Sequence, residues 1–309
     1  MRALIGMEKH LGTDHPDTLV SVNNLALVHS SQGRYEEAEV LHQRALSGRR
    51  KHLGVDHRDT LESMNNLAVV YCSQGRYEEA ETLHFQELAG TEKRLGYDHL
   101  DTLISVNNLA LVYESQGRYC KAETLRQRAL AGREKHLGTH HRDTLASMND
   151  LALVYESQGR YHQAEVLHRQ ALAGREGYLG PDHPDTLASL NNLAFVCESQ
   201  GRYDEAEALH TRVLANWEQH LGASHQNTLT SISNLARLYE SQGRYEDAEV
   251  FHQRALAGRG KHLGANHPHT LASMNHLARL YESQGRHDET EVLRARAFNG
   301  GMGNVGASM

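Results

Sequence analysis

Asparagine side chains recur at a fixed position along this sequence of 309 residues. The first set is Asn23, Asn65, Asn107, Asn149, Asn191 and Asn275, and a second set follows one residue later as Asn24, Asn66, Asn108, Asn192 and Asn234. An amide can donate to a peptide carbonyl and accept from a peptide N–H. We therefore predict that these amides hold an extended chain, mainly through the second set. The alternative is that one asparagine of each pair bonds to neighbouring backbone and only stabilises the fold.

Histidine is abundant, with 23 residues, which raises the question of a metal site. Histidine pairs recur five residues apart, as in His52 and His57, His220 and His225, and His262 and His267. Two imidazoles on one helix face need a four-residue step, and a five-residue step across a glycine fixes no chelate without carboxylate or thiolate ligands. We expect no metal ion, and we expect the second histidine to pack beside the start of a helix. The cysteines stand at unrelated positions and are predicted to be free thiols.

Signatures of catalysis are absent from the sequence. It has no phosphate loop and no Gly-x-Ser-x-Gly motif, and its polar motifs each recur five to seven times, whereas a catalytic site is normally unique. We therefore predict a protein that is not an enzyme and needs no cofactor.

Charge and hydropathy restrict the partners. The formal charge is −7, with acidic and basic residues interleaved, which disfavours nucleic acid. No apolar run approaches the roughly 18 residues that cross a bilayer, and the first ten residues lack the apolar stretch of a signal peptide. These features predict a cytoplasmic protein without membrane contact.

A period of 42 residues organises the chain. The pentapeptide Ser-Gln-Gly-Arg-Tyr ends at Tyr35 and at every 42nd residue to Tyr245, and it returns with His287 in place of tyrosine. A Leu-Gly pair keeps the same period, and its glycines lie 21 residues from those of the pentapeptide. Because glycine reaches the left-handed conformation that ends many helices, each repeat is predicted to contain two helices.

Each half of the repeat has the pattern of an amphipathic helix. In the first half, named helix A, apolar residues recur at spacings of three and four, as in Leu19, Val22, Leu25 and Ala26. Helix A is predicted to be capped by the residues Asp14, Asp56, Asp98, His140, Asp182, Ser224 and Asn266. The second half, named helix B, runs from Tyr35 to about Leu53 and contains a glycine at Gly48, Gly90, Gly132, Gly174 and Gly258. Each such glycine costs about 1 kcal/mol relative to alanine, which close approach of a neighbouring helix, or else a bend, would explain.

A helical hairpin of this size cannot bury its apolar face alone, so the hairpins must stack. The predicted fold is all-α, a right-handed α-solenoid of antiparallel helix pairs, with seven repeats over residues 13–298, helix A on the concave side and helix B outside. Residues 1–12 align with the end of a helix B and are predicted to be the remnant of a preceding repeat. Residues 299–309 are predicted to form a flexible tail. We expect a fragment of a larger protein, or one whose open ends associate.

The hairpin resembles a tetratricopeptide repeat, because Leu25-Ala26, Gly33, Tyr35, Ala38 and Ala45 match signature residues of that family. The 42-residue length, the Asn-Asn-Leu-Ala motif and the run Leu-Gly-x-Asp-His-Pro-Asp-Thr-Leu resemble the kinesin light chain type. Arrays of this type also occur in fungal and bacterial nucleotide-binding, receptor-like proteins. The resemblance covers nearly the whole chain, and it implies a cargo-binding or adaptor role in which an extended peptide lies in the concave groove.

Specificity is predicted at positions where the near-identical repeats differ. Three residues after the second asparagine, the series is apolar first and then basic: Leu27, Val69, Leu111, Leu153, Phe195, Arg237 and Arg279. A ligand with hydrophobic anchors and a charged end would fit this series. The alternative is that Arg237 and Arg279 form surface ion pairs with Glu240 and Glu282, three residues further on.

The sequence thus predicts a non-catalytic scaffold that binds a protein or peptide and is part of a larger signalling or receptor-like protein. Two alternatives remain open. One is a cargo adaptor similar to kinesin light chains, although no sustained heptads are present. The other is a structural array that assembles end to end.

Overall fold

The structure, a computed structural model, describes residues 2–305, with side chains described for residues 4–300. The described residues form 15 helices and no strand. The A helices are α2 (Pro16–Ser31), α4 (Arg58–Ser73), α6 (Leu100–Ser115), α8 (Arg142–Ser157), α10 (Pro184–Ser199), α12 (Gln226–Ser241) and α14 (Pro268–Ser283). The B helices are α3 (Tyr35–Leu53), α5 (Tyr77–Leu95), α7 (Tyr119–Leu137), α9 (Tyr161–Leu179), α11 (Tyr203–Leu221), α13 (Tyr245–Leu263) and α15 (His287–Val305), and α1 (Arg2–Leu11) precedes them.

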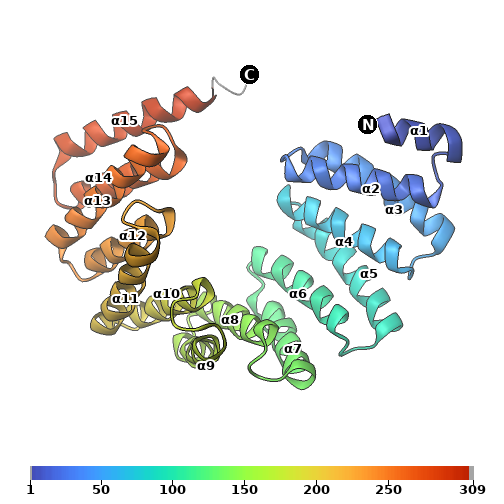
Figure 1. The fold of residues 1–309 in the computed structure, drawn as a ribbon, viewed down its shortest axis with the longest axis horizontal. Coiled ribbons are helices and arrows are strands. Elements are labelled where there is room, and N and C mark those ends of the chain that lie inside the picture. Colours follow the sequence, from blue (N-terminus) through green and yellow to red (C-terminus); the bar gives the residue numbers. More distant parts are fainter. Residues whose placement is uncertain (1, 306–309) are drawn as a thin grey trace. The chain divides into compact units, whose positions relative to one another are not determined.

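The chain divides into two compact units, Met1–Leu167 and His168–Met309. From α1 to α8 and from α10 to α15, each helix packs on the helices next to it in the chain, so that A and B helices alternate (Figure 1). The predicted all-α stack of antiparallel helix pairs is confirmed.

Each hairpin turn is built on one glycine. In the first repeat, Gly33 has a φ of 74°, and two hydrogen bonds close the end of α2: Gly33 N–H donates to the Ser30 carbonyl (3.0 Å) and Arg34 N–H donates to the His29 carbonyl (2.9 Å). This pattern is a Schellman motif, which requires the left-handed conformation that glycine adopts without strain. The repeated Gly-Arg step therefore reverses the chain as the sequence predicts.

The cap of helix A differs from the prediction. In each repeat the N-cap is a histidine, one residue later than predicted. In the first repeat it is His15 instead of Asp14, and the His15 Nδ1 atom accepts a hydrogen bond from Asp17 N–H at 3.3 Å. The caps of the later A helices are His57, His99, His141, His183, His225 and His267. The aspartate instead lies close to a lysine of helix B, as in Asp98 and Lys135 (2.8 Å). The predicted position of the second histidine beside the start of helix A is correct.

Close packing explains the glycines inside helix B. A Cβ atom on Gly48 would lie 2.6 Å from Leu19 Cδ1, and one on Gly132 would lie 2.5 Å from Leu103 Cδ1. Both leucines belong to helix A of the same hairpin and are almost completely buried. The close approach of a neighbouring helix, rather than a bend, therefore accounts for these glycines.

The last helix extends beyond the predicted boundary at residue 299. α15 continues to Val305, and a Cβ atom on Gly300 would lie 2.8 Å from Leu271 Cδ2. Gly300 thus occupies the place of Gly48 in the seventh repeat, which gives this segment a packing partner that the glycine-rich composition did not suggest. Residues 306–309 of the predicted tail lie outside the described residues.

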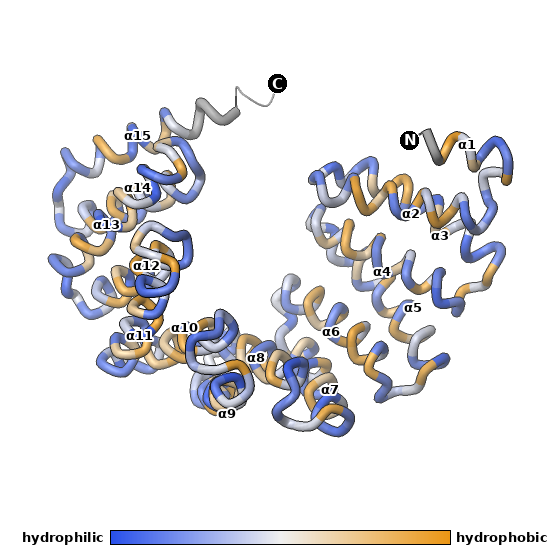
Figure 2. The backbone as a smooth tube through the Cα atoms, in the orientation of Figure 1, coloured by the Kyte–Doolittle hydropathy of each residue, from blue (hydrophilic) through white to orange (hydrophobic). Residues whose placement is uncertain are grey.

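The core of each unit lies between the two helix layers. In the first unit, Leu46 of α3 packs with Met64 and Leu67 of α4, and the repeated alanines such as Ala26 and Ala38 are fully buried. Leu4 of α1 packs with Val22 of α2 in the same way, so α1 takes the position of a B helix in front of α2. Figure 2 shows the resulting alternation of hydrophobic and hydrophilic turns along the helices.

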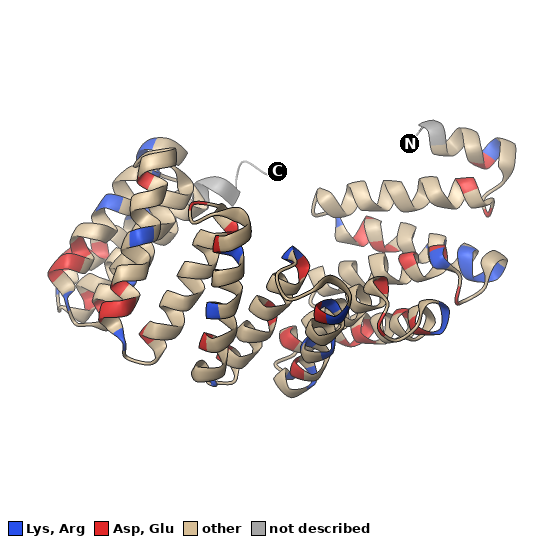
Figure 3. Ribbon diagram, turned by 60° about the horizontal axis from the view of Figure 1, so that its bottom comes forward, with Lys and Arg blue, Asp and Glu red and all other residues tan. Residues whose placement is uncertain are grey.

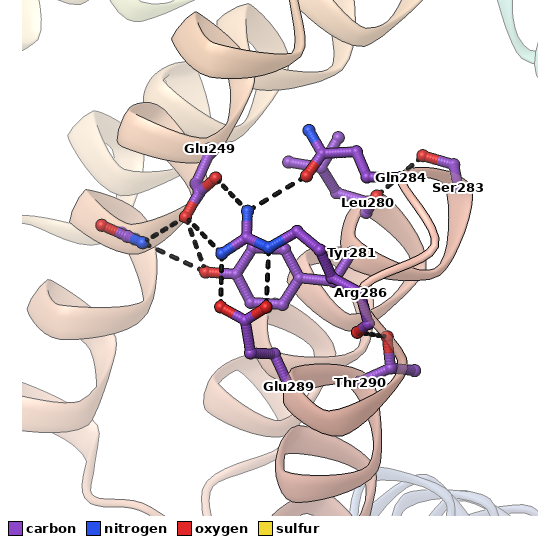
Figure 4. A network of polar contacts seen from close by, with 9 residues as sticks. Glu249, Leu280, Tyr281, Ser283, Gln284, Arg286, Glu289 and Thr290 are labelled. Carbon is purple, nitrogen blue, oxygen red and sulfur yellow. Dashed lines mark hydrogen bonds and ion pairs between the residues drawn. The ribbon is translucent and has the colours of Figure 1, made fainter.

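In five of the hairpin turns, an arginine joins one repeat to the preceding one. Arg286 Nη1 donates to Glu249 Oε2 at 2.5 Å and to Gln284 Oε1 at 3.0 Å, and its guanidinium lies 3.8 Å from the centre of the Tyr281 ring (Figure 4). The hydrogen bond from Arg286 lowers the pKa of the Glu249 carboxyl. The same arrangement recurs with Arg76 and Glu39, Arg118 and Glu81, Arg160 and Glu123, and Arg244 and Glu207. The invariant arginine of the pentapeptide therefore stabilises the stack.

Candidate functional site

Asparagines of the first set contact helix B of their own repeat in the first and fifth repeats. Asn23 is 2% exposed, and its Oδ1 atom lies 3.0 Å from His42 Nδ1. Because an amide oxygen only accepts, His42 carries its proton on Nδ1. Asn191 and His210 repeat this contact, also at 3.0 Å.

The second asparagine reaches back to the preceding repeat. Asn66 Nδ2 donates to Asn23 Oδ1 at 3.3 Å, and Asn108 Nδ2 donates to Asn65 Oδ1 at 2.8 Å. These amides therefore link successive A helices, and the partners are side chains instead of the backbone that the sequence suggested. Asn149 and Asn192 also have partners.

Three asparagines of the two sets have different surroundings. Asn24 and Asn275 are exposed, and Asn234 is partly buried in α12. In α12, Ser233 replaces the first asparagine, and its hydroxyl donates to the Leu229 carbonyl at 3.0 Å. The amide ladder is thus interrupted at this repeat.

Arginine replaces the buried histidine in the third repeat. Arg126 is 4% exposed, and its Nη1 atom donates to Asn107 Oδ1 (3.2 Å) and to Asp150 Oδ2 (3.0 Å), while Nε donates to Glu114 Oε1 (2.7 Å). Asp150 stands at the position of a second asparagine. The charged pair therefore substitutes for the histidine and amide pair at the same place.

Burial keeps three histidines of this row neutral. Desolvation lowers the pKa of His42, His84 and His210 to about 4 in each case. For His42 and His210, the positive charges of Arg49 and Arg237 lower the pKa further. These side chains act as neutral hydrogen-bonding groups at neutral pH.

An exposed apolar row follows the A helices of the first unit. Leu27, Val69, Leu111 and Leu153 come from α2, α4, α6 and α8, and their exposed fractions are 44%, 50%, 51% and 41%. Among the described residues, the B helices of this unit have no such row, because the exposed Val40 and Val166 are separated by Thr82 and Thr124 at the equivalent positions. The predicted variable series is therefore solvent-accessible in this unit, with the amide ladder beside it in sequence.

In the second unit the same series contains an aromatic and a basic residue. Phe195 is 38% exposed, and the Arg237 guanidinium lies 5.5 Å from the centre of its ring. Arg237 also lies 3.5 Å from Glu198 of the preceding A helix. The alternative interpretation paired Arg237 with Glu240, but Glu240 instead contacts the buried His252 of α13.

Arg279 likewise does not pair with Glu282, which lies 2.5 Å from Arg294 of α15. Arg279 is exposed and forms no ion pair within residues 4–300. This guanidinium is thus accessible to a ligand.

One buried group was missed from the sequence. Glu87 stands in α5 where the other repeats have Ala45, Ala129, Ala171, Val213, Ala255 and Ala297. Its side chain is 7% exposed and lines a cavity of about 510 Å³ between α4, α5 and α6. Comparing the seven copies position by position would have found this carboxyl, since it replaces a small apolar residue at a position that is otherwise apolar.

The rest of the described surface is mixed in charge. Lysine and arginine alternate with aspartate and glutamate along the helices (Figure 3). Within the described part of the chain, no helix is long and apolar enough to span a bilayer, and no three histidine, cysteine or carboxylate side chains are grouped to hold a metal ion. Cys72, Cys120 and Cys197 are free thiols.

The tetratricopeptide repeat family matches the chain over six overlapping segments and one further segment. The segments are residues 1–51, 17–93, 59–135, 101–177, 143–219 and 185–261, followed by 270–298. Comparison with curated proteins finds no match.

Solved structures of repeat proteins are similar to this chain. A putative kinesin light chain with nearly identical repeats from Podosopora anserina is 31% identical, with a TM-score of 0.62 over 67% of this chain and 98% of that chain. A signal transduction ATPase with a tetratricopeptide repeat sensor from Pyrococcus horikoshii has a TM-score of 0.66 at 15% identity, over 96% of this chain and 42% of that chain. The apo form of the quorum sensor NprR from B. thuringiensis has a TM-score of 0.56 at 17% identity, over 97% of this chain and 91% of that chain. The chain belongs to the tetratricopeptide repeat family, and its repeats are similar to those of kinesin light chains.

Proposed function

We propose that this protein binds an extended peptide segment of a partner on the surface formed by its A helices. The observation that carries the proposal is the row Leu27, Val69, Leu111 and Leu153, in which each side chain is 41–51% exposed. Aligned apolar groups that stay in contact with water mark interaction surfaces, because covering them is favourable. The second unit exposes Phe195 and Arg279 at the equivalent positions of its own A helices, which would offer an aromatic contact and a charged contact there.

The amide ladder has a supporting role in this proposal. Asn66 and Asn108 each give one hydrogen bond to the preceding repeat, which leaves the amide oxygen of each as an acceptor for a peptide N–H. Such contacts hold a backbone without reading its sequence, and the varied side chains three residues further on would supply the specificity.

The place of this surface in a larger signalling protein is part of the proposal. It is supported by the similarity in fold to the signal transduction ATPase with a tetratricopeptide repeat sensor. The peptide or protein partner would then be the signal that such an array detects.

Selection from a random peptide library displayed on phage tests the proposal. Leu111→Ser with Leu153→Ser is expected to weaken binding of the selected peptides at least tenfold. Phe85→Ser with Val166→Ser is the matched control, since these residues are 61% and 46% exposed on B helices of the same unit, and it is expected to keep the affinity. Equal losses in both double variants, or no peptide selected, would contradict the proposal.

A further inference from the structure

The second repeat lacks a polar contact that the first, third, fourth and sixth repeats have. In the first repeat, Arg49 of α3 is 4% exposed, and its Nη1 atom donates to Ser63 Oγ and to the Asp59 carbonyl, both at 2.8 Å. The contact with the serine recurs for Arg133 and Ser147, Arg175 and Ser189, and Arg259 and Ser273. A guanidinium therefore fills the space between helix B and the next helix A in these repeats.

No arginine fills the equivalent space between α5 and α6. The position of Arg49 is taken by Thr91, and the position of Ala45 is taken by Glu87. Ser105, which corresponds to Ser63, instead donates to Glu87 Oε1 at 2.5 Å, and Thr91 Oγ1 donates to the same oxygen at 3.1 Å. The loss of the long side chain leaves the cavity of about 510 Å³.

The second oxygen of the carboxyl lacks a partner. Glu87 Oε2 is buried and accepts no hydrogen bond, and the residue as a whole is only 7% exposed. A buried polar atom without a partner costs about 1–3 kcal/mol, and more when it is charged. Burial also raises the pKa of the Glu87 carboxyl, and a cation that pairs with it would offset the cost of ionising it.

The lining of the cavity favours a cation. Besides Glu87, the carboxylates of Glu62 and Asp101 line it, together with the guanidinium groups of Arg58 and Arg94. Arg58, Glu62, Arg94 and Asp101 are exposed, and Glu87 is the buried charged residue of the lining. The buried end of the cavity is therefore acidic, and its acceptors include the serine that receives a guanidinium in the other repeats.

We propose that this cavity binds the guanidinium group of an arginine side chain of the partner peptide, with the Glu87 carboxylate as its counter-ion. The inference rests on the proposed binding of a peptide by the A helices, because Asn65, Ile104 and Asn108 of that surface also line the cavity. The arginine of the ligand takes the place of the arginine that the second repeat lacks. Planar, bidentate pairing with a carboxylate is the interaction for which guanidinium is suited.

Methyl NMR gives a direct test, because the chain has only three isoleucines, Ile5, Ile104 and Ile232. Ile104 lines the cavity, whereas Ile5 lies on α1 and Ile232 on α12. Titration with N-acetyl-arginine methylamide is expected to shift the Ile104 methyl signal in a saturable manner and to leave the other two unchanged. The neutral isostere N-acetyl-citrulline methylamide is expected to give no saturable shift.

The matched variant rebuilds the contact of the neighbouring repeats. Glu87→Ala with Thr91→Arg restores the residue types of the first repeat, so it is expected to fold and to abolish the Ile104 response. Glu87→Gln, which keeps the shape, is expected to weaken the response at least tenfold. An unchanged titration in the double variant, an equal response to citrulline, or tighter binding of N-acetyl-lysine methylamide would overturn the assignment.

The two proposals fail separately. Suppose that the phage selection yields peptides without arginine, and that these peptides bind the Glu87→Ala, Thr91→Arg variant as tightly as the unchanged protein. Peptide binding then stands and the arginine cavity is refuted. If Ile104 responds to arginine while the selection yields no peptide, the cavity stands and the proposed peptide surface is refuted.

Discussion

The Nδ1 atom of His42 lies 3.0 Å from the amide oxygen of Asn23, and both side chains are almost completely buried. The contact joins helix B to helix A within one repeat, and Asn66 of the next repeat donates to the same oxygen. A neutral imidazole is thus part of the connection between repeats, which makes the stack sensitive to acid.

Acid is expected to destabilise the protein below pH 6.5. The pKa of His42, His84 and His210 falls from about 6.5 to about 4 on folding, so the unfolded chain binds more protons between these values. Stability is therefore full above pH 6.5 and decreases as the pH falls toward 4, by up to about 2 kcal/mol per histidine at pH 4.5. Urea unfolding at pH 7 and pH 4.5 measures this. His84→Gln is expected to reduce the difference, and a pH-independent midpoint would contradict the prediction.

Two glycines of α13 are expected to respond in opposite ways to alanine. A Cβ atom on Gly258 would overlap the side chain of Leu229, whereas one on Gly260 would meet no atom within 4 Å. Gly258→Ala is expected to lower the free energy of unfolding by about 1–3 kcal/mol, because it overpacks the core. Gly260→Ala is expected to raise it by about 1 kcal/mol through helix propensity. Thermal unfolding followed by circular dichroism compares them, and similar effects of the two changes would refute the packing explanation.

The stabilising contact of the turn arginine Arg118 is expected to depend on the planar guanidinium group, which lysine lacks. Arg118 donates to Glu81 (2.5 Å) and Gln116 (2.8 Å), and it stacks on Tyr113. Arg118→Lys is expected to lower the free energy of unfolding by about 1 kcal/mol, a modest value because the pair is partly exposed.

Arg34→Lys is the control for this change. Arg34 hydrogen-bonds only to residues of its own turn, Glu37 and Gln32, so a change of a few tenths of a kcal/mol is expected. Urea unfolding of both variants measures the difference. Equal effects would show that the contact between repeats adds no stability.

Replacing Glu87 is expected to stabilise the protein. Glu87→Ala removes a buried oxygen without a partner and introduces the residue type found at Ala45 and Ala129. We expect the free energy of unfolding to rise by about 1–2 kcal/mol. Urea unfolding measures this, and a loss of stability would show that the carboxyl supports the fold. Ser105→Ala is the control, for which no gain in stability is expected.

The features that could be predicted from the sequence are those that depend on residues close together in the chain. The hairpin turns depend on the conformational freedom of single residues such as Gly33, and the helices depend on apolar spacing within one segment, so both were predictable. The cap was displaced by one residue because Asp14 and His15 are adjacent and both can accept a hydrogen bond; only the backbone geometry at the start of α2 selects the histidine.

The sequence by itself determined that this protein is a stack of seven helical hairpins, since a strict 42-residue repeat leaves each hairpin no other way to bury its apolar face. Only the tertiary structure decided the partners of its polar groups. Asn108 meets Asn65 across 43 positions, and Ser105 meets Glu87 across 18. Such contacts depend on the offset between packed helices, which no local pattern encodes, so the cavity beside Glu87 became visible only when α4, α5 and α6 were placed together.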